Sequence, residues 1–185
     1  MGLRGPSDIL WHSQPCTGGC PWQKYNMRKG ESTREKIKDH YKLFRDIWKA
    51  FTEIAEIAIK RGAMVIIEWP KGCAYWNNMK VKNFLRKHEF DETFIDGCMY
   101  GLVASSGNEV GTPIRKPWRL AHRGLRFTPD LKTCDHSHSH TPCQGKNTKD
   151  TESYTDRMVQ TIMKQFCKNH AMMKNQSKQT ENQCL

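Results

Sequence analysis

The chain is 185 residues long, enough for one domain with a core of its own. Its mean hydropathy is −0.79, and no apolar run approaches the roughly 18 residues of a membrane span, so a membrane-embedded protein is not expected. The 30 Lys and Arg residues exceed the 19 Asp and Glu residues, and the net charge of +11 predicts nucleic acid, in the first place DNA, as the partner. Solvated surface charge is the alternative explanation.

The first residues and the cysteines both indicate an intracellular protein. Residues 1–6 form neither the apolar core of a signal peptide nor an amphipathic transit peptide, so we expect a nuclear or cytoplasmic location. The 8 cysteines are irregularly spaced, and two of them flank a histidine-rich stretch. This spacing favours free thiols and a metal ion in a reducing compartment over a disulfide framework.

Regular structure is predicted to begin within residues 8–20. Ile9, Leu10 and Trp11 form a short apolar run that predicts a buried strand, and the run leads into a glycine loop that contains Cys16. The basic, aromatic segment after this loop has no period. It predicts a surface loop that covers or touches a ligand.

A long amphipathic helix is predicted next. Ser32 and Glu35 have the spacing of a capping box, and apolar residues follow at alternating steps of four and three. Lys60, Arg61 and Gly62 predict the end of the helix, because cations suit the last turn and glycine suits the left-handed cap.

The second half of the predicted sheet follows this helix. Residues 63–68 form an apolar run that is typical of a strand buried on both faces of a parallel sheet. A short helix is predicted over residues 79–88, and strand regions over residues 93–102 and 118–122. The order of elements predicts an α/β fold whose sheet is mostly parallel, with a terminal antiparallel strand.

Cys16 and Glu68 follow the carboxyl ends of two predicted strands, which is where ligands bind in open α/β sheets. A thiol in a glycine turn opposite a carboxylate predicts a nucleophile and an acid. Basic neighbours such as Lys24, Arg115 and Arg119 would favour the thiolate. A buried cysteine and a salt-bridged glutamate are the alternative interpretation.

A cysteine hydrolase is a further alternative. His12 or His40 would then act as the base toward Cys16. Against it, no Asn or Asp is placed to orient either histidine.

The order of these motifs resembles the later half of the catalytic domain of DNA (cytosine-5) methyltransferases. Residues 8–18 resemble the strand and Pro-Cys loop of the family's catalytic motif, and residues 65–70 resemble its Glu-Asn-Val strand. Residues 100–102 and 114–119 resemble the Tyr-Gly-Val and Gln-x-Arg-x-Arg strand pair, and residues 154–166 the final helix. The likeness is greatest to methyltransferase-like segments in retroelement polyproteins of marine invertebrates and protists, so the rest of a polyprotein is a further expected partner.

The resemblance implies a partial class I methyltransferase fold, Rossmann-like, that lacks the N-terminal half, because the donor-binding motif would precede Asp8. It implies that a flipped cytosine enters the pocket, where Cys16 attacks C6 and Glu68 holds and protonates N3. Arg115 or Arg119 would orient the ring. The contacts to S-adenosylmethionine would come from Pro15, Gly18 and Gly19. Without the donor-binding half, the isolated chain is expected to be inactive.

The Cys/His-rich residues 132–146 predict a zinc site. Alternating histidines on an extended segment point to one side, and a thiolate at each end completes a tetrahedral set of nitrogen and sulfur ligands. The predicted ligands are Cys134, His138, His140 and Cys143, with His136 as a substitute. A solvated histidine-rich loop is the alternative.

Two groups of residues are predicted to contact nucleic acid. The loop residues Trp22, Lys24 and Tyr25 are placed to stack on bases and to neutralise phosphate. Arg123 and Arg126 belong to a basic run that predicts a phosphate-binding stripe. The full run is Arg115, Lys116, Arg119, Arg123 and Arg126. Packing over the sheet edge and a solvated surface are the respective alternatives.

The predicted organisation has four parts. They are a methyltransferase-like domain over residues 1–131, a zinc loop over 132–146, a helix that packs back over 147–168 and a disordered tail over 169–185. The expected function is that of a truncated or degenerate cytosine-5 methyltransferase-like domain of mobile-element origin that binds nucleic acid. The alternative is a non-enzymatic nucleic-acid-binding module with a zinc knuckle and a basic tail.

Overall fold

The computed structural model describes residue 5 and residues 7–128 and 131–183. The chain divides into two compact units, of which unit 1 is Met1–Thr93 with Trp118–Gly124 and unit 2 is Phe94–Pro117 with Leu125–Leu185. This division differs from the boundary expected after residue 131, because a strand from the second half of the chain belongs to the sheet of unit 1.

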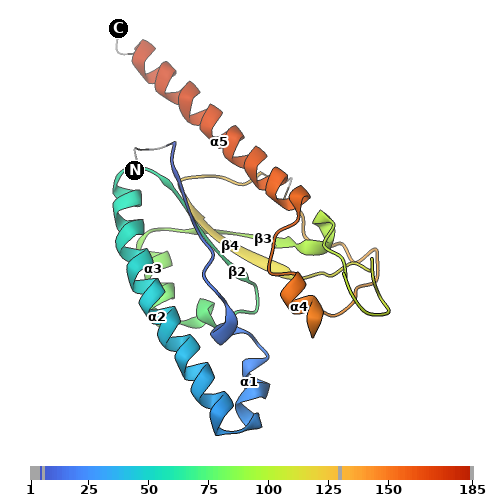
Figure 1. Cartoon of the computed structure of the whole chain (residues 1–185). Helices are drawn as coiled ribbons and strands as arrows, with labels where there is room; N and C mark the ends of the chain where they lie inside the picture. The colour runs from blue at the N-terminus through green and yellow to red at the C-terminus, as the bar shows by residue number, and fades with distance from the viewer. Residues whose placement is uncertain (1–4, 6, 129–130, 184–185) are drawn as a thin grey trace. The chain divides into compact units, whose positions relative to one another are not determined.

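The sheet is mixed rather than mostly parallel. Its strands in the described residues are β1 (Ile9–His12), β2 (Met64–Pro70), β3 (Asp91–Asp96) and β4 (Pro117–Arg123). They lie in the order β1-β2-β4-β3 (Figure 1). β1 runs parallel to β2, and β4 runs antiparallel to β2. The α/β class agrees with expectation, but the mostly parallel sheet was wrong, because only β1 and β2 are joined directly by a long helical crossover.

Helices are found where they were predicted, over residues 31–60, 79–87 and 156–183, whereas the short helix over residues 23–26 lies in a segment that was expected to be a loop. The helices are α1 (Gln23–Asn26), α2 (Glu31–Lys60), α3 (Met79–Lys87), α4 (Lys146–Asp150) and α5 (Asp156–Gln183). Short 3-10 helices include η1 (Thr17–Gly19), η3 (Ala74–Asn77) and η4 (Gly97–Tyr100). A strand region was predicted over residues 93–102, but the observed strand β3 ends at Asp96 and η4 follows it. No helix in the described part of the chain is long and apolar enough to cross a membrane.

The ends of α2 differ in how well the sequence predicted them. Gly30 is the N-cap, with φ 127°, and no side chain caps the helix. The predicted capping box is therefore not formed, because Ser32 lies inside the first turn and Glu35 pairs with Lys38 at 2.7 Å. The other end was predicted correctly, since Gly62 has φ 77° and closes the last turn in the left-handed conformation.

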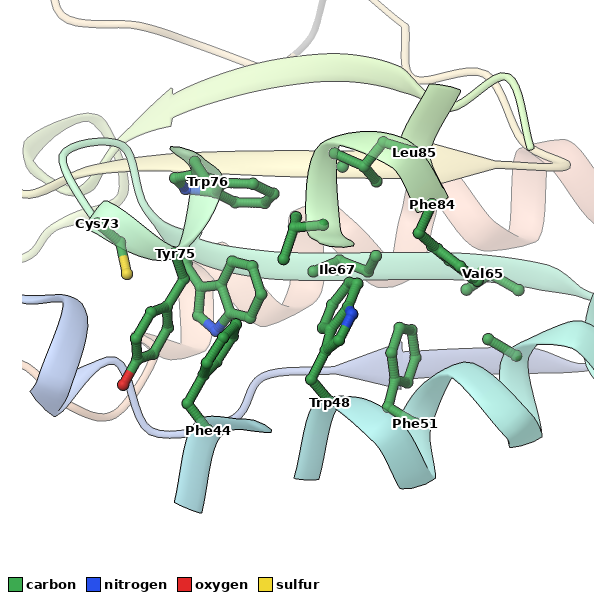
Figure 2. Packing of buried hydrophobic residues seen from close by; sticks show 14 of the residues in the cluster. Phe44, Trp48, Phe51, Val65, Ile67, Cys73, Tyr75, Trp76, Phe84 and Leu85 are labelled. Carbon is green, nitrogen blue, oxygen red and sulfur yellow. The ribbon is translucent and has the colours of Figure 1, made fainter. Parts of the chain in front are cut away.

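The core of unit 1 is aromatic. The α2 side chains in it are Phe44, Trp48, Phe51, Ala55 and Ala58, the stripe that the apolar spacing predicted. Figure 2 shows the aromatic members directed at the strand that carries Val65 and Ile67. Phe44 also stacks on Tyr75, with ring centroids 3.9 Å apart. Residues 64–69 of β2 are all buried, as expected for a strand covered on both faces.

Buried hydrogen bonds supplement a smaller apolar core in unit 2. Its buried apolar residues include Leu102, Ile114, Leu125, Met158, Ile162 and Phe166. The buried Gln165 accepts the N–H of Thr128 at 2.9 Å. The buried Asn169 accepts the N–H of Arg126 at 2.8 Å and donates to the Arg126 carbonyl at 2.9 Å. These amides bind the segment after β4 to α5.

α5 is longer than predicted. A helix was expected over residues 154–166, with a disordered tail from residue 169, but the helix continues to Gln183. The segment contains no Gly or Pro and is rich in Met, Lys and Gln, which favour helix. Residues 184–185 of the expected tail lie outside the described part of the chain.

Candidate metal site

Four side chains of unit 2 form a group that can hold a metal ion: Cys98, Cys134, His138 and His140. Their ligand atoms all lie within 4.8 Å of one another. Cys134 Sγ lies 3.8 Å from His138 Nε2 and 3.4 Å from His140 Nε2. Tetrahedral zinc, with bonds of about 2.3 Å to sulfur and about 2.0 Å to nitrogen, separates a sulfur and a nitrogen ligand by about 3.6 Å. The spacing therefore fits one tetrahedral ion.

Asp96, the last residue of β3, connects the two segments that supply the ligands. Its buried carboxylate accepts the N–H of Cys134 at 2.8 Å and an Nε–H of Arg115 at 3.3 Å. Its own N–H donates to the Lys132 carbonyl at 3.2 Å. Cys98 follows in η4, so this one carboxylate fixes the Cys134 segment beside Cys98.

The histidine segment is turned rather than extended as predicted. His136 adopts φ 62°, and its N–H donates to Cys134 Sγ at 3.3 Å. The Asp135 side chain accepts the N–H two residues later at 3.0 Å, which stabilises the turn. The turn brings His138 and His140 to Cys134, whereas His136, the predicted substitute ligand, lies outside the group.

Burial and neighbouring groups set the protonation of these side chains. Burial, together with a hydrogen bond and charge repulsion from the adjacent Cys134, raises the pKa of Cys98 to about 12. Burial, His138 and His136 lower the pKa of His140, which keeps its imidazole neutral. A bound cation would stabilise both thiolates and displace their protons. Because the chain supplies all four ligands, the arrangement is that of a structural site.

The structure brings together Cys134, His138 and His140 of the predicted ligand set, but Cys98 takes the place of Cys143. Cys143 Sγ lies instead 3.3 Å from Thr151 Oγ1. Cys143 was chosen because it is near the histidines in sequence, whereas Cys98 reaches them only through the fold. The sequence offered little signal for Cys98, which follows Gly97 inside the strand region predicted over residues 93–102.

Cys16 and Glu68 lie after β1 and near the end of β2, which pair in parallel and so present the same edge of the sheet. Glu68 is buried, and Ser13 Oγ donates to its Oε2 at 2.6 Å. Cys16 is half-buried against the aromatic core. The thiol of Cys73 lies beside the same glycine loop. Burial is the main cause that raises the pKa of Cys73 to about 12, with smaller contributions from Cys16, Cys20 and Glu68, so Cys73 is protonated.

The glycines of the loop accommodate the protein's own side chains. A Cβ at Gly18 would lie 2.5 Å from Tyr75 Oη, and a Cβ at Gly19 would lie 2.6 Å from Cys73 Sγ. Both glycines are buried, and Pro15 is exposed beside them. The space that the missing side chains leave is already filled. Packing therefore explains the two glycines, and the contacts of Pro15, Gly18 and Gly19 to S-adenosylmethionine stay a prediction.

The two arginines that were predicted to orient the cytosine ring are engaged elsewhere. Arg119 is opposite Trp69 in the β2–β4 register, and Trp69 neighbours Glu68 along β2. Since consecutive side chains of a strand alternate between faces, Arg119 and Glu68 lie on opposite faces of the sheet. The Arg119 guanidinium stacks on Trp76, 4.4 Å from the ring centre. Arg115 belongs to unit 2, in the ion pair with the carboxylate of β3.

The loop residues predicted to contact nucleic acid are accessible. Trp22 and Tyr25 are 53% and 61% exposed, and Lys24 lies between them in the single turn of α1. Lys29 Nζ lies 5.3 Å from the centre of the Tyr25 ring. Exposed rings beside cations are suited to stacking on bases.

Most cations of the predicted phosphate-binding stripe bind other groups of the protein. Lys116 donates to the Thr151 carbonyl, and Arg123 donates to the His88 carbonyl just after α3. Arg115 and Arg119 form ion pairs with Asp96 and Glu92, respectively. The run is also divided between the two units, and Arg126 at its end is exposed. Most of these cations therefore stabilise the fold.

His12, one candidate base for a hydrolase, is part of the aromatic core. Its ring stacks on Phe51 with centroids 3.9 Å apart, and burial lowers its pKa to about 4. His40, the other candidate, lies close to the glycine loop, because a Cβ at Gly18 would be 3.0 Å from its Cβ. The placement of His12 is explained by packing.

Comparisons with protein families, with characterised proteins and with solved structures found no match to this chain. The likeness to cytosine-5 methyltransferases stays a prediction from the sequence motifs.

Proposed function

We propose that this chain is a zinc-stabilised α/β module that binds nucleic acid and has no catalytic role of its own. The observation that carries the proposal is the group of Cys98, Cys134, His138 and His140. Two thiolates and two imidazoles are the donor set that zinc takes in structural sites. With four protein ligands, the ion has no open position for a substrate, so it supports binding by holding the fold.

The support for nucleic acid is electrostatic and aromatic. The net charge of +11 attracts polyanions, and binding would release the counterions that are condensed on the phosphates. Trp22 and Tyr25 offer exposed rings beside Lys24 and Lys29. A positively charged surface with exposed aromatic side chains is the combination found where proteins bind single strands.

Metal analysis of the purified chain tests the zinc site. We expect about one zinc per chain, and its loss in Cys98→Ser, which removes a thiolate ligand. Cys143→Ser and His136→Ala are matched controls, because they change the same residue types outside the group and should keep the ion. Cobalt substitution should give the strong visible absorption of a tetrahedral thiolate site. Loss of zinc in Cys143→Ser but not in Cys98→Ser would show that the ligand assignment is wrong.

Binding of fluorescently labelled DNA and RNA tests the nucleic-acid half of the proposal. The logarithm of the association constant should fall linearly with the logarithm of the salt concentration, because phosphate contacts release counterions. Single-stranded and duplex probes of the same sequence separate stacking from groove binding. No binding of any probe at low salt would contradict the proposal.

A cytosine pocket of the methyltransferase type is the second candidate. The parallel β1–β2 pair favours it, because it carries Cys16 and Glu68 to the same edge of the sheet, where Ser13 orients the carboxylate. In this interpretation the Cys16 sulfur adds to C6 of a flipped cytosine while Glu68 donates to N3.

DNA that contains 5-azacytosine tests this second candidate, because a thiolate added at C6 of this ring can be trapped by protonation of N5 without transfer of a methyl group. A denaturation-resistant adduct should form with the wild type and be lost in Cys16→Ser, whereas Cys20→Ser, a thiol from the same loop, should keep it. Absence of an adduct with and without S-adenosylmethionine would remove the candidate. It would leave the zinc-stabilised module unaffected.

A further inference from the structure

A groove of about 720 Å³ opens between α2 and α3 in unit 1; it is called the α2–α3 groove below. Phe44, Trp48 and Phe84 line its floor, and Figure 2 shows the same side chains as part of the aromatic core. Its cations are Arg45 and Lys49 of α2 and Lys80 and Lys87 of α3. The groove therefore has an apolar floor and a positively charged rim.

The charge of the groove is not balanced from within. One carboxylate lines it, Glu56, whose Oε1 lies 2.6 Å from Lys87 Nζ and 3.0 Å from His88 Nε2. These contacts lower the pKa of Glu56, so it is ionised and engaged. Within the described part of the chain, no ion pair joins the other three cations of the groove to a carboxylate. Three positive charges remain for a ligand.

The placement of these charges suits an extended anion. Arg45 and Lys49 are one helical turn apart, about 6 Å along α2. Lys80 lies in the first turn of α3, on the other side of the groove. Cations on both sides match a run of phosphates better than a single small anion. Met79 on the rim is 64% exposed and gives a sugar or base an apolar contact.

We infer that the α2–α3 groove binds the sugar–phosphate backbone of nucleic acid, with Arg45, Lys49 and Lys80 neutralising phosphates. The inference rests on the proposed function, because it requires that the chain binds nucleic acid. It places the phosphate contacts on a surface that no sequence motif indicated. The arginines of the predicted stripe are largely occupied by the fold, whereas these three cations are exposed.

A charge-matched pair of triple variants tests the inference in the full zinc-bound chain. The test variant is Arg45→Gln, Lys49→Gln and Lys80→Gln. The control variant is Lys36→Gln, Lys146→Gln and Lys164→Gln, which removes the same charge at exposed positions outside the groove. Lys36 is on α2 itself, half a turn around the helix from Arg45. Thermal melts should be similar, because every altered side chain is exposed.

The readout is the affinity for labelled single-stranded DNA over a range of salt concentrations. Each phosphate contact to a single strand contributes about 0.7 to the slope of the logarithm of the association constant against the logarithm of the salt concentration. The loss of three contacts should therefore reduce this slope by about 2 and weaken binding about 100-fold at about 0.1 M salt. The control variant should lose far less, since it lacks only long-range attraction, which salt screens.

The possible failures are distinguishable. Equal weakening in both triple variants would show that the groove has no local role, although nucleic-acid binding by the chain would stand. A wild type that binds neither DNA nor RNA at low salt would overturn the proposed function together with the inference. Groove-dependent binding of poly-glutamate, without binding of nucleic acid, would replace the inferred occupant by an acidic peptide.

Discussion

The two units of this chain differ in the interactions that stabilise each of them internally. In unit 1, the Trp48 ring has the rings of Phe51, Trp69 and Phe84 at centroid distances of 5.3 to 5.8 Å. In unit 2, buried polar side chains such as Asp96 and Gln165 bind backbone groups. The first unit is stabilised by apolar packing and the second by a network of hydrogen bonds around a metal-binding group.

This difference has a thermodynamic consequence. Apolar burial acts additively over many contacts, so it tolerates the loss of one of them. A buried hydrogen-bond network stabilises only while its partners are in place, because an unpaired buried polar group is costly. Small units with limited cores commonly depend on a metal ion or a disulfide. A metal ion bound at this group should therefore stabilise unit 2 far more than unit 1.

Metal removal should have the largest effect and separate the two units. Structural zinc contributes about 10 kcal/mol or more to small zinc-dependent folds, so chelation should unfold the metal-binding segment. Hydrogen exchange should become fast at amides such as those of Leu102 and Cys134, while that of Ile67 stays protected. Simultaneous loss of protection in both units, or in neither, would contradict the comparison.

Truncating the aromatic core should destabilise unit 1 and leave the metal-binding group of unit 2 intact. Trp48→Ala removes a buried side chain at the centre of the unit 1 cluster and should lower the free energy of unfolding by about 3–5 kcal/mol. Ile54→Ala, on the same helix but 50% exposed, is the control and should cost well under half as much. Urea denaturation measures both. The zinc content of Trp48→Ala should match that of the wild type; zinc loss would mean that the metal group depends on the aromatic core.

Acid should weaken unit 1 through His12. Its pKa is about 4 in the folded chain and 6.5 when unperturbed, so the unfolded chain binds the additional proton between these values. The free energy of unfolding should therefore be fully retained above pH 6.5 and fall by roughly 2–3 kcal/mol as the pH drops toward 4. His12→Phe keeps a ring against Phe51 and removes the titration. Urea denaturation along a pH series should show a smaller slope in this variant, and equal slopes would exclude His12 as the cause.

The glycine loop should give a smaller effect. Gly19→Ala places a Cβ 2.6 Å from Cys73 Sγ and should cost about 1–3 kcal/mol through overpacking. Adding Cys73→Ala should recover part of this loss, because the nearest atom is gone while the Tyr75 ring remains at 3.0 Å. A double-mutant cycle measures the coupling. Strictly additive losses would show that the glycine is needed for another reason, such as a bound ligand.

Much of unit 1 could be predicted because its signals are local. The apolar spacing of α2 and the continuous apolar run of β2 each report a period or a burial state that neighbouring residues determine. The capping box failed because Ser32 and Glu35 make a motif by spacing alone, while the N-cap of the helix is Gly30, two residues before Ser32. Local patterns predicted the elements better than their boundaries.

The candidate sites depended on long-range contacts. His138 and His140 were found because they alternate near Cys134, but Cys98 joins them only through the carboxylate of Asp96. Likewise, Arg119 was expected beside Glu68, and the register of β4 against β2 put them on opposite faces of the sheet. A shift of one residue in register would have reversed that outcome, and the sequence contains no local signal for it.

The sequence by itself determined the α/β class, the aromatic stripe of α2, the buried β2 strand and the positive charge, because composition and periodicity act within one segment. Only the tertiary structure decided that β4 lies between β2 and β3, that Cys98 rather than Cys143 completes the group that can hold a metal, and that three cations of α2 and α3 share one groove. The physical reason is that strand register and helix packing place distant side chains together, and they are settled by the burial of the whole chain rather than by any one stretch of it.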